Sequence, residues 1–345
     1  MYHIPMTPSG RLISIALQGD KSAREYAEIA EMAEGLGFDG VSVYADLGFQ
    51  PAIAPLVIIA QQTRRVRVGP AALNPSLIHP VEIAGQIAML DAISDGRAYL
   101  GLARGAWLDA LGIDERRPVR RLREAVEVIT RVLAGDAEGY EGEIFRLPPQ
   151  RLRRYDVPRA AVPLTIGTWG RQAGAFAGEV ASEIKIGGSA NPAMVPSMRG
   201  FLRVGEERAG RPIGGVGVAL GAVTICDEDG DAARALARRE VARYLPVVAP
   251  LDPTVHVAPE TLRRMARLVD AGDVGAAADL VPDDLLDRFA FSGTPGQIVR
   301  QAEAIFAAGA SRIEFGTPHG VTALQGIRLL GEQVLPALRR TPGAT

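Results

Sequence analysis

Short apolar runs alternate with helical segments along the first third of this chain, and this alternation constrains the fold most. The runs span 12–17, 41–44, 66–69 and 98–102, and helical patterns span 23–36, 55–63 and 81–93. The repeat of roughly 25 to 30 residues is typical of parallel strands joined by right-handed helical crossovers. Eight such units would close a parallel sheet into a barrel.

Further units follow after a basic amphipathic helix expected at 119–133. Apolar runs recur at 164–167, 183–186, 216–225 and 312–315. Helical patterns lie at 172–180, 295–308 and 325–338, and two more are expected, one that begins near 193 and one that follows the acidic segment 227–231 and ends near 244. Residues 246–291 read as short helical pieces, 259–271 and 276–286, without a strand signal. We therefore predict one (β/α)8 TIM barrel domain over residues 1–345, with a helical insertion at about 246–291.

Composition narrows the class of protein. With 345 residues, 47% of them hydrophobic and 23% charged, the chain can bury a large core. The formal net charge of -2 does not favour binding to nucleic acid or to an anionic membrane, so we expect a small-molecule substrate. Cys226, the single cysteine, excludes an internal disulfide framework. Neither a signal-peptide pattern nor an apolar run of about 18 residues is found, and we expect a cytoplasmic enzyme.

Several common chemistries lack their motifs. The four histidines are far apart and show no metal-ligand spacing. A P-loop is absent, and Gly215-Val216-Gly217 begins a strand instead of following one, so a dinucleotide fingerprint is not supported. Gly187-Gly188-Ser189 lacks the second glycine of a nucleophile elbow. No metal site is predicted.

The segment after the run 66–69 is longer than a minimal βα turn. Gly69-Pro70 and Asn74-Pro75 interrupt the chain before the next helix opens at His79-Pro80. In parallel α/β folds, ligands bind at the carboxyl ends of the strands, where the βα loops are free to vary. This loop and its neighbours are therefore the candidate site.

Several short motifs occur in an order that resembles a known family. They are Gly-Phe-Asp-Gly-Val at 37–41, Ala-Ala-Leu-Asn-Pro at 71–75, Leu-Asp-Ala-Ile-Ser-Asp-Gly-Arg at 90–97, Gly-Thr-Trp-Gly at 167–170, Ser-Ala-Asn-Pro at 189–192, Ser-Gly-Thr-Pro at 292–295 and Gly-Thr-Pro at 316–318. Over about 12–338 the chain resembles the bacterial luciferase-like superfamily, in its coenzyme F420-dependent branch and in particular methylenetetrahydromethanopterin reductase. The resemblance implies a luciferase-like barrel that binds the 5-deazaflavin F420.

The resemblance also implies positions for the cofactor. Asp46 would contact the deazaflavin head group, although a helix cap or a salt bridge is an equally good interpretation. A non-proline cis peptide near Ala71-Ala72 would back the central ring, and helix N-termini favour phosphate. Glycines that only make tight turns are the alternative for the later loops. The predicted cofactor-binding residues are Asp46, Ala71, Ala72, Leu73, Asn74, Gly105, Gly167, Thr168, Trp169, Gly170, Arg171, Ser189, Ala190 and Asn191.

Three polar residues of the related reductases are replaced at the expected pocket. Ala16 stands at a glutamate position, Leu47 at a histidine position and Ala106-Trp107 near an aspartate position. The resulting pocket is less polar. The predicted substrate-binding residues are Gln18, Tyr44, Phe49, Trp107 and His319, and the predicted catalytic residues are Asp46 and Arg104. The arginines at 116–123 indicate a solvated helix face, or else a surface for the polyglutamate tail of F420.

The function expected from the resemblance is reduction by F420H2 of a C=N or activated C=C bond in a small metabolite. One alternative is an FMN-dependent monooxygenase of the same superfamily, since the same barrel mouth accepts either ring. Another is a protein that binds the cofactor without turnover. Apolar helices at 55–63 and 81–93 would suit the interface of a homodimer, and no nucleic-acid or membrane partner is expected.

Overall fold

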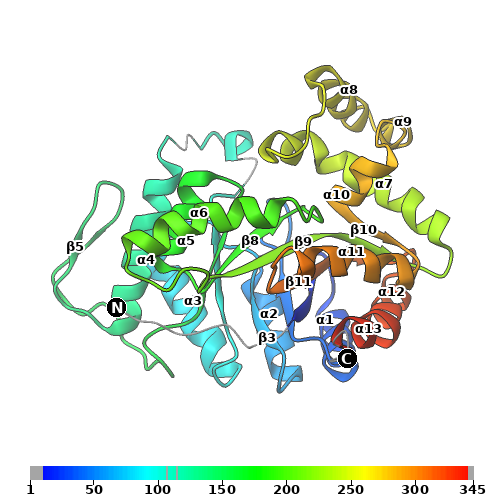
Figure 1. Ribbon diagram of the computed structural model, residues 1–345. Helices are drawn as coiled ribbons and strands as arrows, with labels where there is room; N and C mark the ends of the chain where they lie inside the picture. Colours follow the sequence, from blue (N-terminus) through cyan, green and yellow to red (C-terminus); the bar gives the residue numbers. More distant parts are fainter. Residues whose placement is uncertain (1–10, 106–107, 114–115, 341–345) are drawn as a thin grey trace.

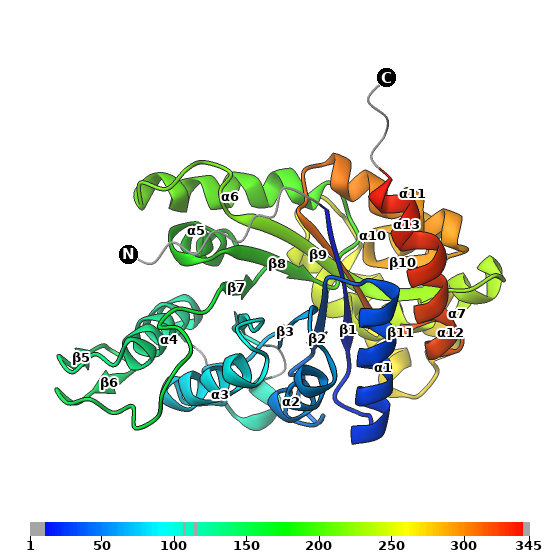
Figure 2. The same ribbon diagram turned by 90° about the horizontal axis from the view of Figure 1, so that it is seen from below.

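The barrel forms the body of the molecule (Figures 1 and 2). The computed structural model describes residues 11–105, 108–113 and 116–340. Within these residues, neighbouring parallel strands follow the order β3-β2-β1-β11-β9-β8-β7-β4. Their bounds are β1 Leu12–Leu17, β2 Gly40–Val43, β3 Arg67–Pro70, β4 Leu100–Ala103, β7 Leu164–Gly167, β8 Glu183–Gly187, β9 Gly217–Cys226 and β11 Arg312–His319. Single bridges join Val68 to Ala98 and Leu73 to Leu102, so β3 meets β4 and the barrel nearly closes. The predicted (β/α)8 fold is confirmed.

Helices surround the strands, as the alternation in the sequence predicts (Figure 2). They are α1 Ala23–Leu36, α2 Ile53–Gln62, α3 Pro80–Ile93, α4 Pro118–Ala134, α5 Arg171–Val180, α6 Met194–Arg208, α7 Gly230–Val248 and α11 Pro295–Ala307. Their ends follow local chemistry. A capping box of Ser22 and Glu25 begins α1, and Gly37, with a φ of 89°, ends it in the left-handed region.

The terminal helix differs from the prediction of one helix over 325–338. Two short helices, α12 Ala323–Leu329 and α13 Leu335–Arg339, flank a π turn over Leu330–Val334. Gly331 lies in this turn, where a Cβ would press on the side chain of Leu36 in α1. The wider turn therefore occurs where this segment packs closely against α1, a contact that sequence periodicity does not report.

The segment after α7 contains α8 Pro259–Asp270, α9 Val274–Ala278 and α10 Asp283–Phe289. In Figure 1, α8 and α9 lie beyond α7, away from the strands. These helices and α7 bury a second apolar cluster that includes Leu245, Met265 and Phe289. Within the described residues, no helix is both long enough and apolar enough to span a bilayer.

The expectation that residues 246–291 contain no strand was wrong. β10, Ala290–Gly293, pairs in parallel with Val223–Cys226 at the end of β9. β9 continues past Gly221, its last partner residue for β8, and so leaves an open edge that β10 covers. Pairing with this edge, together with burial of Phe291, makes a strand from a segment whose own pattern is weak.

Candidate active site

The ends of β1 and β2 bring two predicted site residues into contact. Gln18 Nε2 donates to Asp46 Oδ2 at 3.0 Å, and Gln18 Oε1 accepts from the backbone of Gly19. Asp46 is exposed at this rim, and Phe49, with 45% of its surface exposed, lies in the same loop. One amide donor thus orients the exposed Asp46 carboxylate at the barrel mouth.

The β3 loop has the backbone expected from the resemblance. The Ala71-Ala72 peptide is cis, as predicted. Leu73 donates its backbone N–H to Gly101 at 2.9 Å, which attaches the loop to β4. Asn74 is 4% exposed; its Oδ1 accepts from Ser76, while its Nδ2 lacks a partner in the described part of the chain. A Cβ on residue 105 would collide with that amide, so the glycine at this position makes room for the Asn74 side chain.

The β7 loop leads directly into α5. Gly170 is the N-cap of α5 and supplies no side-chain bond, so the first N–H groups of the helix remain available for an anion. The exposed Arg171 stands at the same end. Trp169 instead donates its indole N–H to the carbonyl of Gly187 at 3.0 Å, joining the β7 and β8 loops. Thr168 Oγ1 accepts from Gly170 at 3.0 Å.

The β8 loop uses its polar side chains inside the fold. Asn191 Nδ2 donates to Asp252 Oδ2 at 2.8 Å and to Thr254 Oγ1 at 2.7 Å. Ser189, which is fully buried, accepts from the backbone of Asn191. These side chains tie β8 to the segment after α7. The backbone N–H groups of Ser189 and Ala190 also donate inside the fold, to the carbonyls of Gly221 and Arg288.

The remaining predicted residues divide into three cases. His319 is 1% exposed, and its Nε2 donates to the carbonyl of Phe315 at 3.2 Å. Burial, and then the charge of Lys21, lower the pKa of His319 to about 4, so its ring is neutral inside the fold. Arg104 is exposed on the β4 loop. Trp107 lies outside the described residues.

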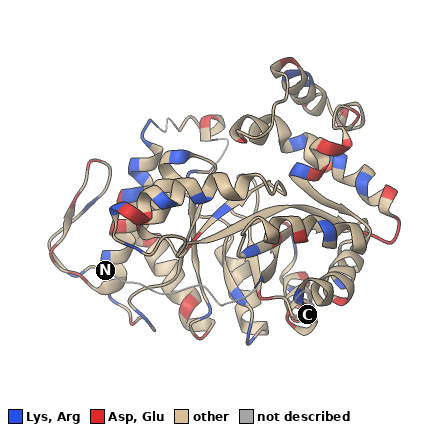
Figure 3. Cartoon of the chain, in the orientation of Figure 1, with Lys and Arg blue, Asp and Glu red and all other residues tan. Residues whose placement is uncertain are grey.

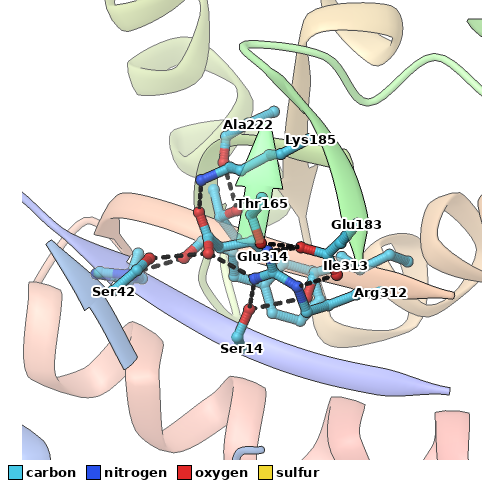
Figure 4. A network of polar contacts seen from close by, with 12 residues as sticks. Ser14, Ser42, Thr165, Glu183, Lys185, Ala222, Arg312, Ile313 and Glu314 are labelled. Carbon is cyan, nitrogen blue, oxygen red and sulfur yellow. Dashed lines mark hydrogen bonds and ion pairs between the residues drawn. The ribbon is translucent and has the colours of Figure 1, made fainter. Parts of the chain in front are cut away.

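A buried charge network inside the barrel was missed in the sequence (Figure 4). Lys185 Nζ donates to Glu314 Oε1, and Ser42 Oγ donates to Glu314 Oε2 at 2.8 Å. Arg312 donates to Glu314 at 2.7 Å and forms two bonds to Glu183 at 2.9 and 2.6 Å. Most other charged positions lie on helices and loops (Figure 3). The interior thus carries two matched ion pairs.

The network lies directly beneath the mouth on one side. In the register of the sheet, Lys185 pairs with Gly167, the last residue of β7. Its Nζ lies 5.4 Å from the centre of the Tyr44 ring, which follows β2. Burial favours the neutral form of Glu314, but Lys185 and Arg312 outweigh it and lower its pKa to about 2. Burial, followed by Glu314 and Asp46, raises the pKa of Tyr44 well above its ordinary value.

The sequence carried a signal for this network. Two buried strands contain charges two residues apart in complementary order, Glu183 and Lys185 on β8 and Arg312 and Glu314 on β11. Residues two apart on a strand share a face, and the inner face of a barrel holds charges only when they are paired. The opposite order of signs therefore predicts two cross-barrel pairs.

A separate small cavity lies at the amino ends of the strands. Its lining includes Ser14, Arg67, Tyr99, Glu183 and Arg312. Binding sites of barrels occur at the other end, and residues at this end serve stability. We assign this cavity no part in the candidate site.

Comparison with known proteins shows which proteins this chain is similar to. A family model described as luciferase-like monooxygenase matches residues 5–312. The 5,10-methylenetetrahydromethanopterin reductase of Archaeoglobus fulgidus is 30% identical over 330 residues, covering 93% of this chain and 97% of that protein. The F420-dependent glucose-6-phosphate dehydrogenase of Nakamurella multipartita is 29% identical, covering 92% and 94%. The structure of the coenzyme F420-dependent tetrahydromethanopterin reductase from Methanopyrus kandleri superposes with a TM-score of 0.86 at 26% identity, covering 95% and 99%.

Proposed function

Because the chain belongs to the luciferase-like monooxygenase family, we propose that it is a coenzyme F420-dependent oxidoreductase of the reductase type. The observation that carries this proposal is the similarity, over nearly the full length of both chains, to relatives whose names state F420 dependence. The reaction is hydride transfer from the reduced deazaflavin to a C=N or activated C=C bond of a small metabolite. The replacements at Ala16 and Leu47 leave the identity of that metabolite open.

The residues at the mouth fit a flat, polar-edged ring. Asn74 holds a buried amide Nδ2 without a partner in the described residues, and such a group favours a ligand acceptor. Small residues end the neighbouring strands: a Cβ on Gly167 would lie 3.2 Å from that of Ala103 and 4.0 Å from that of Ala72. Large side chains here would occupy the space that a ring needs.

We assign the binding roles on this basis. The bound deazaflavin supplies the hydride. The segment from Ala71 to Asn74 would back the ring and bond its polar edge, while Asp46, held by Gln18, would contact the head group. The N-terminus of α5 with Arg171 would hold the phosphate. The protein positions the ring and excludes water, which is the contribution a scaffold makes to hydride transfer.

The first test is a fluorescence titration of the purified protein with F420 and, separately, with FMN. We expect binding of F420 at a Kd at least about tenfold below that of FMN, equivalent to about 1.4 kcal/mol. Preference for FMN, followed by oxygen consumption with FMNH2, would instead assign the monooxygenase reaction suggested by the family description. Binding of F420 without oxidation of F420H2 by any imine or enone would indicate a binding protein without turnover.

Asp46→Ala provides a residue-level test of the head-group contact. We expect the Kd for F420 to rise, or kcat to fall, by about tenfold or more, as for loss of a charged hydrogen bond. Asp284→Ala, which removes an exposed carboxylate at the start of α10, is the control and should leave both values unchanged. Wild-type values for Asp46→Ala would show that this residue only caps the loop.

We also propose a homodimer that uses the outer faces of α2 and α3. Met89 on α3 is 62% exposed, and Ile53, Val57 and Ile58 on α2 are apolar and only partly buried. Apolar side chains gathered on one surface favour a protein partner over solvent.

A further inference from the structure

Reduction of a polar double bond requires a proton donor in addition to a hydride. The hydride adds to carbon, and the electron pair of the broken π bond moves to nitrogen or to a conjugated oxygen, which then needs a proton. Two candidate groups are poorly placed for this role. His319 is buried and donates to Phe315, and the Asp46 carboxylate accepts from Gln18 at the rim.

Tyr44 is placed differently. It follows β2 at the mouth, is half-buried, and its backbone N–H donates to Leu17 at 2.9 Å. Its hydroxyl lies over β11, where a Cβ on Gly316 would come within 2.5 Å of it. Among the described residues, none forms a hydrogen bond with this hydroxyl. A phenol at the mouth therefore keeps its proton available for a bound molecule.

Lys185 stands beside that phenol in a fixed position. Its Nζ lies 5.4 Å from the centre of the Tyr44 ring and donates to Glu314. Gly221 makes room for the Lys185 side chain, since a Cβ at this position would lie only 3.2 Å from Lys185 Cε. Glu314 is held in turn by Ser42 and Arg312. An ammonium next to a phenol stabilises the phenolate that forms when the proton leaves.

We propose that Tyr44 is the proton donor of this reaction and that Lys185, held by Glu314, is its positioning residue. Tyr44 gives its O–H proton to the nitrogen, or to the conjugated oxygen, of the substrate as the hydride reaches carbon. The O–H bond of Tyr44 breaks, and the phenolate next to Lys185 takes a proton back from water. The substrate gains two electrons and two hydrogens while the deazaflavin is oxidised. This inference rests on the proposed F420-dependent reduction.

The ionisable groups that act electrostatically on Tyr44 are Lys185, Glu314, Asp46, Tyr244 and Tyr99. Burial first, and then the two carboxylates, keep the pKa of Tyr44 well above its ordinary value. The phenol thus stays protonated at neutral and mildly alkaline pH. We expect kcat to show no alkaline fall from about pH 7 to about pH 9, because the acid form persists.

Tyr44→Phe is the direct test, since it removes only the hydroxyl. The assay follows oxidation of F420H2 by cyclohex-2-enone and by 1-pyrroline, with the Kd for F420 measured in parallel. We expect kcat to fall by about 10²- to 10⁴-fold while the Kd changes by less than about twofold. Tyr155→Phe is the matched control and should retain kcat, because Tyr155 is 41% exposed in the segment between α4 and β7.

Lys185 needs variants that keep the fold, because removing it alone leaves Glu314 short of a partner. Lys185→Met combined with Glu314→Gln removes both charges of the pair. With an unchanged circular dichroism spectrum, this double variant should lose about tenfold or more in kcat with little change in KM. Lys185→Arg, which keeps a positive charge, should have a kcat between those of the double variant and the wild type. If Lys185 had only a structural role, the variants would change stability and leave kcat and KM unchanged.

The outcomes separate this inference from the proposed function. A wild-type protein that neither binds F420 nor oxidises F420H2 would overturn the proposed function. A wild-type protein that turns over, together with a Tyr44→Phe variant whose kcat stays within about threefold, would overturn the assignment of Tyr44 alone. A wild-type kcat in the folded double variant would show that Lys185 does not position Tyr44.

Discussion

At the scale of single residues, the interior charges distinguish this barrel from one filled with aliphatic side chains. Glu314 is fully buried and accepts from Lys185, Arg312 and Ser42. Breaking a buried pair is costly because the remaining charge has neither water nor a partner. The network therefore ties β8 to β11 inside the barrel, across β9, which lies between them in the sheet.

Glu314→Gln should destabilise the protein at neutral pH by about 3 to 5 kcal/mol, because Lys185 and Arg312 lose their shared counter-charge. The folded pKa of Glu314, about 2, lies below its ordinary value of 4.5. A depressed pKa contributes stability that is present above the unfolded value and is lost as pH falls through the folded value. The difference from wild type should therefore shrink between pH 4.5 and about pH 2.

Urea unfolding over a pH series would measure this difference. Glu303→Gln is the control, because Glu303 pairs with Arg11 at the surface and such pairs contribute about 0 to 1 kcal/mol. A destabilisation of Glu314→Gln that stays constant with pH would contradict the ionised state assigned to Glu314.

Sequence reasoning located the mouth residues unevenly. Asp46 and Gln18, at the ends of neighbouring strands, do meet, because strand order places them side by side. Asn191 faces Asp252 and Thr254, which are 61 and 63 residues away, and no local pattern reveals that pairing. Lys185 and Glu314 could have been found from the alternation of charges along their strands. Contacts that follow from strand order and register are therefore predictable, whereas contacts between loops, such as that of Asn191 with Asp252, are not.

At the scale of elements, α5 and α6 approach closely through glycines. A Cβ on Gly205 of α6 would collide with the carbonyl of Ala175, and one on Gly178 of α5 would collide with the carbonyl of Leu202. Gly200, also on α6, is exposed with nothing within 4 Å of its Cβ position. The contact matters for the site because α5 carries the proposed phosphate position at its N-terminus.

Gly205→Ala and Gly200→Ala should therefore have opposite effects. The added methyl at Gly205 overpacks the interface and should destabilise by about 1 to 3 kcal/mol. The same change at Gly200 should stabilise by about 0.5 to 1 kcal/mol, because alanine is the better helix former. Thermal unfolding of both variants tests this, and two shifts of equal sign would contradict the close approach.

These elements also show where sequence periodicity stops. It predicted α5 and α6 as helices, since their apolar positions recur at helical spacing. It missed β10, because that strand depends on the open end of β9 and not on its own composition. It also merged α12, the π turn and α13 into one helix, since the break depends on contact with α1.

At the scale of the whole molecule, the fold was predictable because a repeated βα unit has few ways to bury both faces of its strands. The same logic places every variable loop at one end and leaves the helices to face solvent or a partner. α2 and α3 are apolar beyond what the barrel buries, with Met89 62% exposed. We expect these exposed apolar side chains of α2 and α3 to form the contact between two copies of the chain.

Wild-type protein should therefore sediment as a dimer at micromolar concentration, and Met89→Glu should raise the dimer dissociation constant by about tenfold or more. An unpaired carboxylate inside an apolar interface loses its hydration without gaining a partner. Ile213→Glu is the control, because Ile213 is 57% exposed in the loop between α6 and β9, away from α2 and α3. Equal association of all three proteins in sedimentation velocity would show that another face, or none, forms the contact. Loss of association in Met89→Glu with retained F420 binding would show that each barrel carries a complete cofactor site.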